Sequence, residues 1–340
     1  MRAAVYSNGD NEFVIQDVAV PTPGPSEVLL QIAAAGVCHS DTFILSDDIP
    51  DSRTYVAGHE NVGYAILLGS DVVGIDIGKL YAIWAIVPHG PNPLPGLPEF
   101  TDSIGLGLNG GFAEYITVDA SNLVPVPDGL APEIAACAAD SLITVYNAMH
   151  NLAQLRPGTT KRVLVYGVGG LGHQAVQLAG AYGATPAARA LALRLGATQA
   201  FHPSELEARF AAQPVGAAGR FGVDVVFDFV SCAQSFALAQ EAVKNVGISS
   251  VGPPGVIVIV GVSGETFTFS PATLLLFRTH VLTSLYGSKS DLAASLELLK
   301  KGTITPVVTT EQLENTDKVI EELRASKVVG RKVIVPMRNN

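Results

Sequence analysis

The sequence predicts an α/β protein with two domains, one rich in β-strands and the other a doubly wound parallel sheet. Three observations lead to this prediction. The chain has 340 residues, which exceeds the usual size of one domain. Short β-branched runs fill about the first 140 residues. From about residue 145, strands and helices alternate around a glycine-rich turn, as in parallel sheets with helices on both faces.

The first part of the chain favours a small β-barrel or sandwich. Proline and glycine separate its short apolar runs, which include residues 28–32, 61–66 and 112–118. The segment 88–98 is dense in proline and cannot pair inside a sheet, so we expect a loop there.

The second part alternates between the two periodicities of strand and helix. The expected elements are strands at 163–166, 224–230, 255–261, 281–286 and 332–335 and helices at 174–182 and 291–300. The last helix and the last strand are expected to return to the first domain.

Charge and composition exclude several classes of function. The net charge of −10 argues against nucleic acid and anionic membranes as partners, because both require basic patches. No run approaches the ~20 apolar residues of a membrane span, and the first residues do not resemble a signal peptide. The three cysteines are too few for a disulfide framework. We therefore expect a soluble, cytoplasmic α/β protein.

The glycine-rich turn at 167–172 follows an apolar strand and precedes a helix. Glycines permit close backbone approach, and a helix N-terminus offers N–H donors to an anion. Although a bare glycine motif is often only a tight turn, this context predicts a contact with a dinucleotide pyrophosphate. The expected contacts are Gly167, Gly169, Gly170, Leu171 and Gly172.

The stretch after this turn and helix departs from the usual dinucleotide-binding pattern. Such domains place a second strand ending in Asp or Glu about 20 residues further on, where the acid binds the ribose hydroxyls. Residues 183–196 contain no acid and no β-branched run, and Pro186 suggests the first turn of a helix. The second strand is therefore predicted to be missing or shortened, and the choice between NAD and NADP stays open.

Three separate segments carry side chains that bind metals, namely Cys38, His59 and Asp140. A thiolate, an imidazole and a carboxylate form a three-ligand zinc site with an open fourth position. Taken singly, Cys38 could be a small buried hydrophobe and His59 an ordinary interior histidine. Asp41 and Glu60 stand close by in sequence, where either could accept a hydrogen bond from the second ring nitrogen of a zinc-bound histidine.

Together these segments resemble the zinc-dependent medium-chain alcohol dehydrogenase family over nearly the whole chain. The motifs that carry the resemblance are residues 36–41, 58–60, 110–115, 140–146, 167–172 and 330–333. The resemblance implies a GroES-like catalytic domain formed by 1–141 and 288–340. It also implies a Rossmann dinucleotide-binding domain formed by 142–287.

The resemblance further assigns roles to individual residues. Cys38, His59 and Asp140 would be the zinc ligands. Asp41 would orient His59, Ser40 would take the alcohol proton, and Glu60 would be an acid able to reach the metal. The implied cofactor contacts are His39 and Arg331 on the pyrophosphate, and Thr144, Val260, Gly261 and Val262 beside the nicotinamide.

The chain departs from the family pattern in three places. The third ligand is usually a cysteine, so a shift in register could make Cys137 the ligand instead of Asp140; a site with one thiolate fewer should be a harder Lewis acid. The structural zinc of the family needs four cysteines near residues 88–104, and this chain has none there, so we expect one catalytic zinc only. Phe43 stands where many members place a proton-relaying histidine.

The predicted function is hydride transfer between NAD or NADP and an alcohol, aldehyde or ketone at a zinc site. Assembly into a homo-oligomer stays open. A degenerate relative with impaired cofactor binding and a non-redox or binding role is the first alternative, and the short second strand favours it. A zinc-free NAD(P)H quinone or enone reductase is the second, but it would not need Cys38, His59 and Asp140 together.

Overall fold

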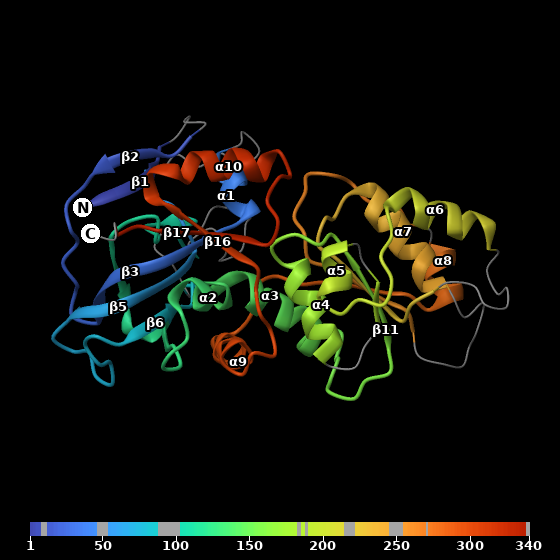
Figure 1. The fold of residues 1–340 in the computed structure, drawn as a ribbon, viewed down its shortest axis with the longest axis horizontal. Coiled ribbons are helices and arrows are strands. Elements are labelled where there is room, and N and C mark those ends of the chain that lie inside the picture. Colours follow the sequence, from blue (N-terminus) through green and yellow to red (C-terminus); the bar gives the residue numbers. More distant parts are fainter. Residues whose placement is uncertain are drawn as a thin grey trace. The chain divides into compact units, whose positions relative to one another are not determined.

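The chain forms two compact units, which we describe from a computed structural model. Unit 1 comprises Met1–Ile143 with Ser288–Asn340, and unit 2 comprises Thr144–Gly287 (Figure 1). The domain limits expected after residues 141 and 287 lie close to these boundaries. The structure describes residues 1–7, 12–45, 54–87, 103–181, 185–187, 190–213, 222–244, 254–269 and 271–337. The proline-dense segment 88–98 therefore lies outside the described residues.

Unit 1 is built around a seven-stranded sheet whose central strand is β3 (Glu27–Val37). The strand β3 pairs with three neighbours: β5 (Glu60–Leu68), β9 (Tyr115–Asp119) and β17 (Arg331–Val335). The sheet continues through β6 (Leu80–Ile83) and β10 (Leu123–Pro125) on one side and β16 (Val308–Gln312) on the other. The strand predicted at 112–118 begins later than expected, at Tyr115.

Smaller sheets and short helices complete unit 1. The additional strands are β1 (Arg2–Tyr6), β2 (Val14–Asp17), β4 (Tyr55–Val56), β7 (Ser103–Ile104) and β8 (Gly107–Leu108). The helices are α1 (His39–Ile44), α2 (Pro132–Ala136), α9 (Lys289–Lys300) and α10 (Thr316–Arg324). Helix α2 packs against β3 and β5, so it covers the strands that lead to the candidate site.

Unit 2 is a five-stranded parallel sheet with the order β12-β11-β13-β14-β15. Its strands are β11 (Arg162–Tyr166), β12 (Thr185–Ala187), β13 (Val225–Asp228), β14 (Val256–Ile259) and β15 (His280–Thr283). Its helices are α4 (Gly172–Ala181), α5 (Ala190–Arg194), α6 (Pro203–Ala212), α7 (Ala233–Val243) and α8 (Pro271–Phe277). The chain runs outward from β11 to β12 and then returns to β13 on the other side, which creates a topological switch point between β11 and β13.

The second strand of unit 2 is present but short. The strand β12 has three residues and pairs only with β11, at the edge of the sheet. The prediction left open whether this strand is missing or shortened, and the structure shows that it is shortened. The prediction that Pro186 opens a helix is wrong, because Pro186 lies within β12 opposite Val163. An edge strand tolerates proline because one side of its backbone needs no N–H donor.

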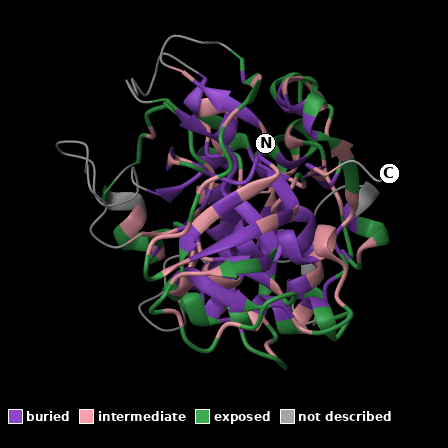
Figure 2. Ribbon diagram, turned by 90° about the vertical axis from the view of Figure 1, so that its left-hand side faces the viewer, coloured by how far each residue is buried: buried purple, intermediate pink, exposed green. Residues whose placement is uncertain are grey.

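Buried residues gather on the strands, and exposed residues gather on the outer turns and helix faces (Figure 2). In unit 2, Leu164, Val226 and Ile257 on neighbouring strands pack against Phe236 of α7 and Phe210 of α6. This apolar layer holds the carboxyl ends of the strands in fixed positions. Among the described residues, no helix has the length and apolar character needed to cross a membrane.

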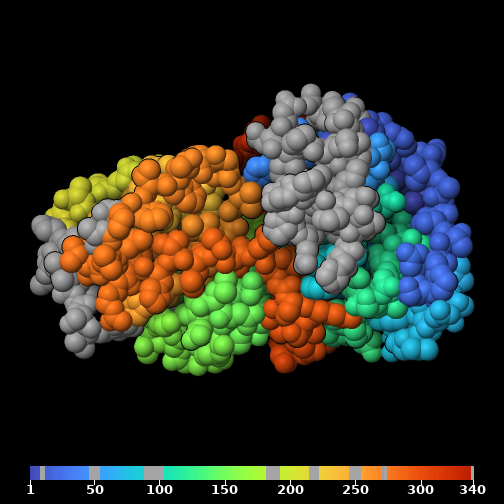
Figure 3. Space-filling model, turned by 180° about the vertical axis from the view of Figure 1, so that it is seen from behind, coloured from blue at the N-terminus to red at the C-terminus, as the bar shows by residue number. Residues whose placement is uncertain are grey.

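The last strand of the unit 2 sheet, β15, pairs with β14 alone among the described strands. Exposed apolar side chains occur on α8 and around β15, namely Leu275, Leu276, Val281 and Leu285. The segment that carries them, orange in Figure 3, forms much of the surface of unit 2 on the face shown. Exposed apolar surface beside an open strand edge is typical of a region that meets another chain.

Candidate active site

The ends of three neighbouring strands in unit 1 bring the predicted ligands together. In the register of the sheet, Gly36 near the end of β3 lies opposite both Glu60, the first residue of β5, and Val333 of β17. Cys38 follows β3 directly, and His59 directly precedes β5. Arg331 is the first residue of β17. The pairing of these three inner strands therefore brings the side chains together at the same end of the strands, although they are distant in sequence.

Cys38, His59 and Asp140 form a buried group that could hold a metal ion. Their ligand atoms all lie within 4.8 Å of one another, and His59 Nε2 is 3.6 Å from Asp140 Oδ2. Ligands placed about 2.0–2.3 Å from one zinc ion are separated by roughly 3.5 Å in a tetrahedron, so small side-chain movements would suffice. The donor set and its spacing are compatible with a catalytic zinc.

Asp41 contacts two of the three candidate metal ligands. Its Oδ1 lies 3.1 Å from His59 Nδ1, and its Oδ2 accepts a 2.8 Å hydrogen bond from the Cys38 N–H. Asp41 is completely buried. Because Nδ1 of His59 is engaged by this carboxylate, Nε2 is the nitrogen that faces Asp140.

Asp140 lies in a single turn of π-helix, Ala138–Leu142, that continues α2. The Leu142 N–H donates to the Cys137 carbonyl at 2.8 Å, five residues back instead of four. Such a wide turn changes the direction of the side chains it carries and is common at functional sites. The hydrophobic pattern of the sequence gave no sign of this turn.

A buried arginine links two carboxylates of the site. Arg331 donates from Nε to Glu60 Oε2 at 2.6 Å and from Nη2 to Asp140 Oδ2 at 2.8 Å. Ser141 donates to the other Glu60 oxygen, Oε1, from its N–H at 3.1 Å and from its hydroxyl at 2.8 Å. Sequence reasoning missed the bond between Arg331 and Asp140 and the contacts of Ser141. The position of Ser141 next to Asp140 was the one available signal for the latter.

Glycine is required at position 36 by the close approach of Glu60. A Cβ atom built on Gly36 would lie 1.8 Å from Glu60 Oε2. Two atoms that are not bonded to each other cannot approach so closely, so any side chain at this position would displace the Glu60 carboxylate.

The buried charges shift one another's pKa values. Burial raises the pKa of Asp140, but the charges of His59 and Arg331 outweigh burial and hold the pKa well below its usual range. Burial lowers the pKa of His59, yet Asp41 and Asp140 raise it well above its usual value. Burial raises the pKa of Glu60, and Arg331 offsets part of this rise. In the metal-free protein these groups therefore form a compact network of alternating charge.

Cys137 does not belong to the ligand group. Its Sγ contacts the Glu133 carbonyl at 3.8 Å, and burial together with the nearby Glu60 raises the pKa of its thiol. In the described part of the chain, the group whose atoms could share an ion consists of Cys38, His59 and Asp140. A protonated buried thiol is a poor metal ligand, which argues against the shifted register.

The remaining predicted residues of unit 1 lie on α1, beside Cys38. The Ser40 hydroxyl is 3.7 Å from Cys38 Sγ and is partly accessible. His39 is exposed on the first turn, and partial desolvation and the charge of Arg331 lower its pKa. Phe43 is half-buried on the same helix.

The glycine turn of unit 2 lies at the switch point of its sheet. Gly167 has a φ of +87°, and a Cβ on Gly172 would lie 1.8 Å from the Gly167 carbonyl oxygen. A Cβ on Gly169 would meet no atom within 4 Å. The turn therefore combines a close strand-to-helix connection with open space above its backbone, and this arrangement fits a pyrophosphate.

The other predicted cofactor contacts of unit 2 are Thr144, Val260, Gly261 and Val262. Val260 and Gly261 follow β14, and their N–H groups donate to the Asp228 carbonyl at 2.9 and 3.1 Å. Val262 is exposed, whereas Thr144 is buried at the beginning of unit 2. The acid expected after the second strand is absent from the sequence, and residues 188 and 189, which follow β12, lie outside the described residues.

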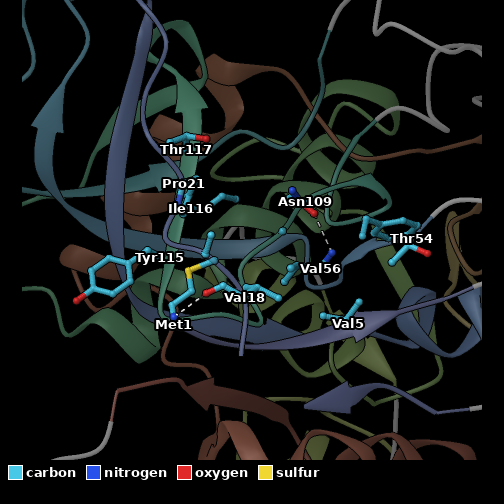
Figure 4. Close-up of a pocket in the computed structure, with 13 residues that line it drawn as sticks. Met1, Val5, Val18, Pro21, Thr54, Val56, Asn109, Tyr115, Ile116 and Thr117 are labelled. Carbon is cyan, nitrogen blue, oxygen red and sulfur yellow. Dashed lines mark hydrogen bonds between the residues drawn. The ribbon is translucent and has the colours of Figure 1, made fainter. Parts of the chain in front are cut away.

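A separate pocket of ≈ 240 Å³ lies in unit 1 beside β1, β4 and β9 (Figure 4). Apolar side chains such as Val5, Val18 and Ile116 form much of its wall. The Met1 amine donates to the Val18 carbonyl, and the Val56 N–H donates to Asn109 Oδ1 (Figure 4). None of its lining residues is a predicted site residue, so we assign the pocket no part in the chemistry.

Among the described residues, a group that could hold a metal ion and a glycine turn that could hold a dinucleotide define the class of a two-domain, metal-dependent oxidoreductase. Residues 24–128 match the family described as alcohol dehydrogenase GroES-like domain, and residues 170–301 match zinc-binding dehydrogenase. An alcohol dehydrogenase from Moraxella sp. (strain TAE123) is 30% identical over 353 residues, covering 98% of this chain and 99% of that protein. This chain belongs to the zinc-dependent medium-chain alcohol dehydrogenase family.

Solved structures agree with this assignment. Acetophenone reductase from Geotrichum candidum in complex with NAD is 30% identical with a TM-score of 0.80, covering 100% of this chain and 98% of that chain. The alcohol dehydrogenase from Aeropyrum pernix is 27% identical with a TM-score of 0.82, covering 99% of this chain and 100% of that chain. The predictions of the family and of a GroES-like domain joined to a Rossmann domain are confirmed.

Proposed function

We propose that this protein transfers a hydride between an alcohol and the corresponding aldehyde or ketone, with NAD or NADP as the second substrate. The observation that carries the proposal is the convergence of Cys38, His59 and Asp140, whose ligand atoms lie within 4.8 Å. Relatives named alcohol dehydrogenase and acetophenone reductase support this class of reaction.

Different residues of the protein would hold the metal, orient one of its ligands and accept the substrate proton. When bound, zinc supplies a Lewis acid for the substrate oxygen and the nicotinamide exchanges the hydride. Cys38, His59 and Asp140 would hold the metal, and Asp41 would keep the imidazole of His59 in the orientation it already has. The Ser40 hydroxyl, on the accessible side of Cys38, would accept the alcohol proton. Phe43 cannot pass a proton onward, so water or a cofactor hydroxyl would do so.

The cofactor contacts are proposed in both units. Gly167, Gly169, Gly170, Leu171 and Gly172 would face the pyrophosphate, as the open space above Gly169 supports. Thr144, Val260, Gly261 and Val262 would lie beside the nicotinamide.

In unit 1, His39 and Arg331 are the proposed pyrophosphate contacts. Two nitrogen atoms of Arg331 are committed to Glu60 and Asp140, whereas His39 is exposed on α1. His39 is therefore the stronger candidate of the two.

One observation favours a second function. The three-residue strand β12 and the absent acid would reduce contacts to the adenosine part of the cofactor. A relative that binds zinc but has lost nucleotide binding would have a non-redox role. A zinc-free quinone or enone reductase has less support, because Asp41 already holds two metal ligands in place.

Metal analysis and nucleotide titration separate these functions. The dehydrogenase should contain about one zinc per chain and should quench the fluorescence of NADH or NADPH. Zinc without quenching would replace the proposal with the degenerate function, and quenching without zinc would replace it with the reductase. Oxidation of a panel of primary and secondary alcohols, followed at the nicotinamide absorbance, then tests the reaction itself.

We also propose a cytoplasmic location and self-association. The three free cysteines, one of which must remain a thiolate to bind zinc, favour a reducing compartment. The exposed apolar residues on α8 and around β15 favour pairing of two chains along this sheet edge. Sedimentation velocity of the protein and of a Leu285→Asp variant tests the second statement, because a charge there should yield monomers.

A further inference from the structure

We propose that Ser141 is a positioning residue that keeps Glu60 off the metal and so leaves Asp140 as the carboxylate ligand. The inference deepens the zinc site of the proposed function and rests on it. Two buried carboxylates, Glu60 and Asp140, lie close to one another at this site, and the inference explains which of them would bind the metal.

Arg331 alone does not determine which of the two carboxylates would bind the metal. Its guanidinium contacts one oxygen of each acid, at 2.6 Å for Glu60 and 2.8 Å for Asp140. Both bonds are buried, charge-assisted and of similar length, so they hold the two carboxylates to a similar degree. A further contact must distinguish them.

Ser141 provides this contact to Glu60. Its N–H and its hydroxyl both donate to Glu60 Oε1, at 3.1 and 2.8 Å. With Arg331 on Oε2, both oxygens of Glu60 are occupied by donors of the protein. Asp140 receives Arg331 on Oδ2, the same oxygen that faces His59 Nε2 at 3.6 Å. Asp140 is thus directed into the ligand group and Glu60 away from it.

The Ser141 hydroxyl has a second acceptor, which makes the contact reversible. Its Oγ lies 2.8 Å from Glu60 Oε1 and 2.9 Å from the Cys137 carbonyl oxygen. A hydroxyl has one proton, so it donates to one of these at a time. If Glu60 turned toward the metal, the hydroxyl could donate to the Cys137 carbonyl instead, whereas the Ser141 N–H and Arg331 Nε would lose Glu60 as their acceptor. The hydroxyl therefore biases the position of Glu60 without locking it.

The charges around the site explain why this bias matters. With a metal bound, Cys38 would be a thiolate beside the carboxyl groups of Asp41, Asp140 and Glu60. Arg331 is a cation that donates to two of these carboxyl groups. Binding of Glu60 would place a third anionic ligand on the metal and would weaken its action as a Lewis acid. Keeping Glu60 on Ser141 preserves the open fourth position.

Cobalt(II) substitution of the full-length protein tests the proposal, because the visible spectrum of cobalt reports the number of its ligands. The wild-type protein and Ser141→Thr, which keeps the hydroxyl, should give the intense spectrum of a four-ligand site. Ser141→Ala should give a weaker and shifted spectrum, because loss of one charge-assisted bond should increase the metal-bound population of Glu60 roughly 10- to 100-fold. The double variant S141A/E60Q should restore the wild-type spectrum.

Two results would overturn the proposal. One is a Ser141→Ala spectrum identical to that of the wild type, with cobalt bound and the fold retained by circular dichroism. The other is a shifted spectrum that Glu60→Gln does not restore. The single variant Glu60→Gln gives an independent measurement if Ser141→Ala does not fold. Its cobalt spectrum should match the wild type, and a changed spectrum would mean that Glu60 is already a ligand. If the wild-type protein binds neither cobalt nor zinc, the proposed function itself fails first.

Discussion

Replacement of Arg331 by Met should strongly destabilise unit 1 by leaving two buried carboxylates without their cation. Arg331 is 3% exposed and makes charge-assisted bonds to Glu60 and Asp140. Removing one partner from a buried ion pair costs about 3–5 kcal/mol, and here a single substitution removes the partner of two acids. We therefore expect a loss near the upper end of this range in metal-free protein.

The penalty of Arg331→Met should depend on pH in a defined direction. Burial raises the pKa of Glu60, and the charge of Arg331 lowers it. Without Arg331 the pKa of Glu60 must rise further above the value in the unfolded chain. An acid with a raised folded-state pKa favours folding below its unfolded pKa, and this contribution is lost as pH rises through the folded pKa. The variant should therefore be more destabilised at pH 8 than at pH 5.

Urea unfolding of metal-free protein at both pH values measures this effect. Arg331→Lys is the matched control, because it keeps the charge but one ammonium cannot occupy the positions of both Nε and Nη2. It should lose about 1.5–3 kcal/mol, the contribution of one charge-assisted hydrogen bond. Equal stability of the Met variant and the wild type at pH 8, or a penalty that does not change with pH, would refute this account of the network.

Five other substitutions test the site and the turn. Asp41→Asn should weaken zinc binding by about 10- to 100-fold in a chelator competition, because the His59 ring loses its anionic acceptor; unchanged affinity would remove Asp41 from the site. Cys137→Ser should keep its zinc while Cys38→Ser loses it, measured by metal analysis, and zinc loss in the Cys137 variant would revive the shifted register. Gly172→Ala should lower the melting temperature and nucleotide binding because its methyl would meet a backbone oxygen at 1.8 Å. Gly169→Ala should weaken nucleotide binding alone, and equal melting temperatures for both variants would contradict this difference.

Sequence reasoning identified the features that depend on residue type and local order. The alternating pattern after residue 145 predicted the parallel sheet, and β11, β13, β14 and β15 were each located to within a few residues. The ligand set of Cys38, His59 and Asp140 followed from metal preference together with the family resemblance. The prediction of the sheet succeeded because apolar periodicity is visible in the sequence. The structure brings the three predicted ligands together, and their binding of a metal stays a prediction.

The features that were missed depend on register and on long-range contact. Arg331 and Asp140 are 191 residues apart, and their hydrogen bond exists because β17 pairs with β3 beside β5. No local pattern encodes that register. Pro186 was assigned to a helix because proline favours a first helical turn, but pairing with β11 outweighed this local preference. The π-helical turn at Asp140 likewise has no local pattern in the sequence that predicts it.

An aspartate as the proposed third ligand, where the family resemblance led us to expect cysteine, changes what the surrounding protein must provide. A thiolate presents one ligand atom, whereas a carboxylate presents two oxygens and can bind a metal in more than one way. Arg331 removes this freedom by holding Asp140 Oδ2 at 2.8 Å. The same guanidinium reaches Glu60, so a carboxylate ligand brings with it a second carboxylate that must be restrained. The contacts of Ser141 with Glu60 supply that restraint within the turn that carries Asp140. The proposed ligand and Ser141 therefore lie in one short segment, whereas Arg331 reaches both carboxylates from β17. In this arrangement an aspartate ligand is chemically consistent with its surroundings.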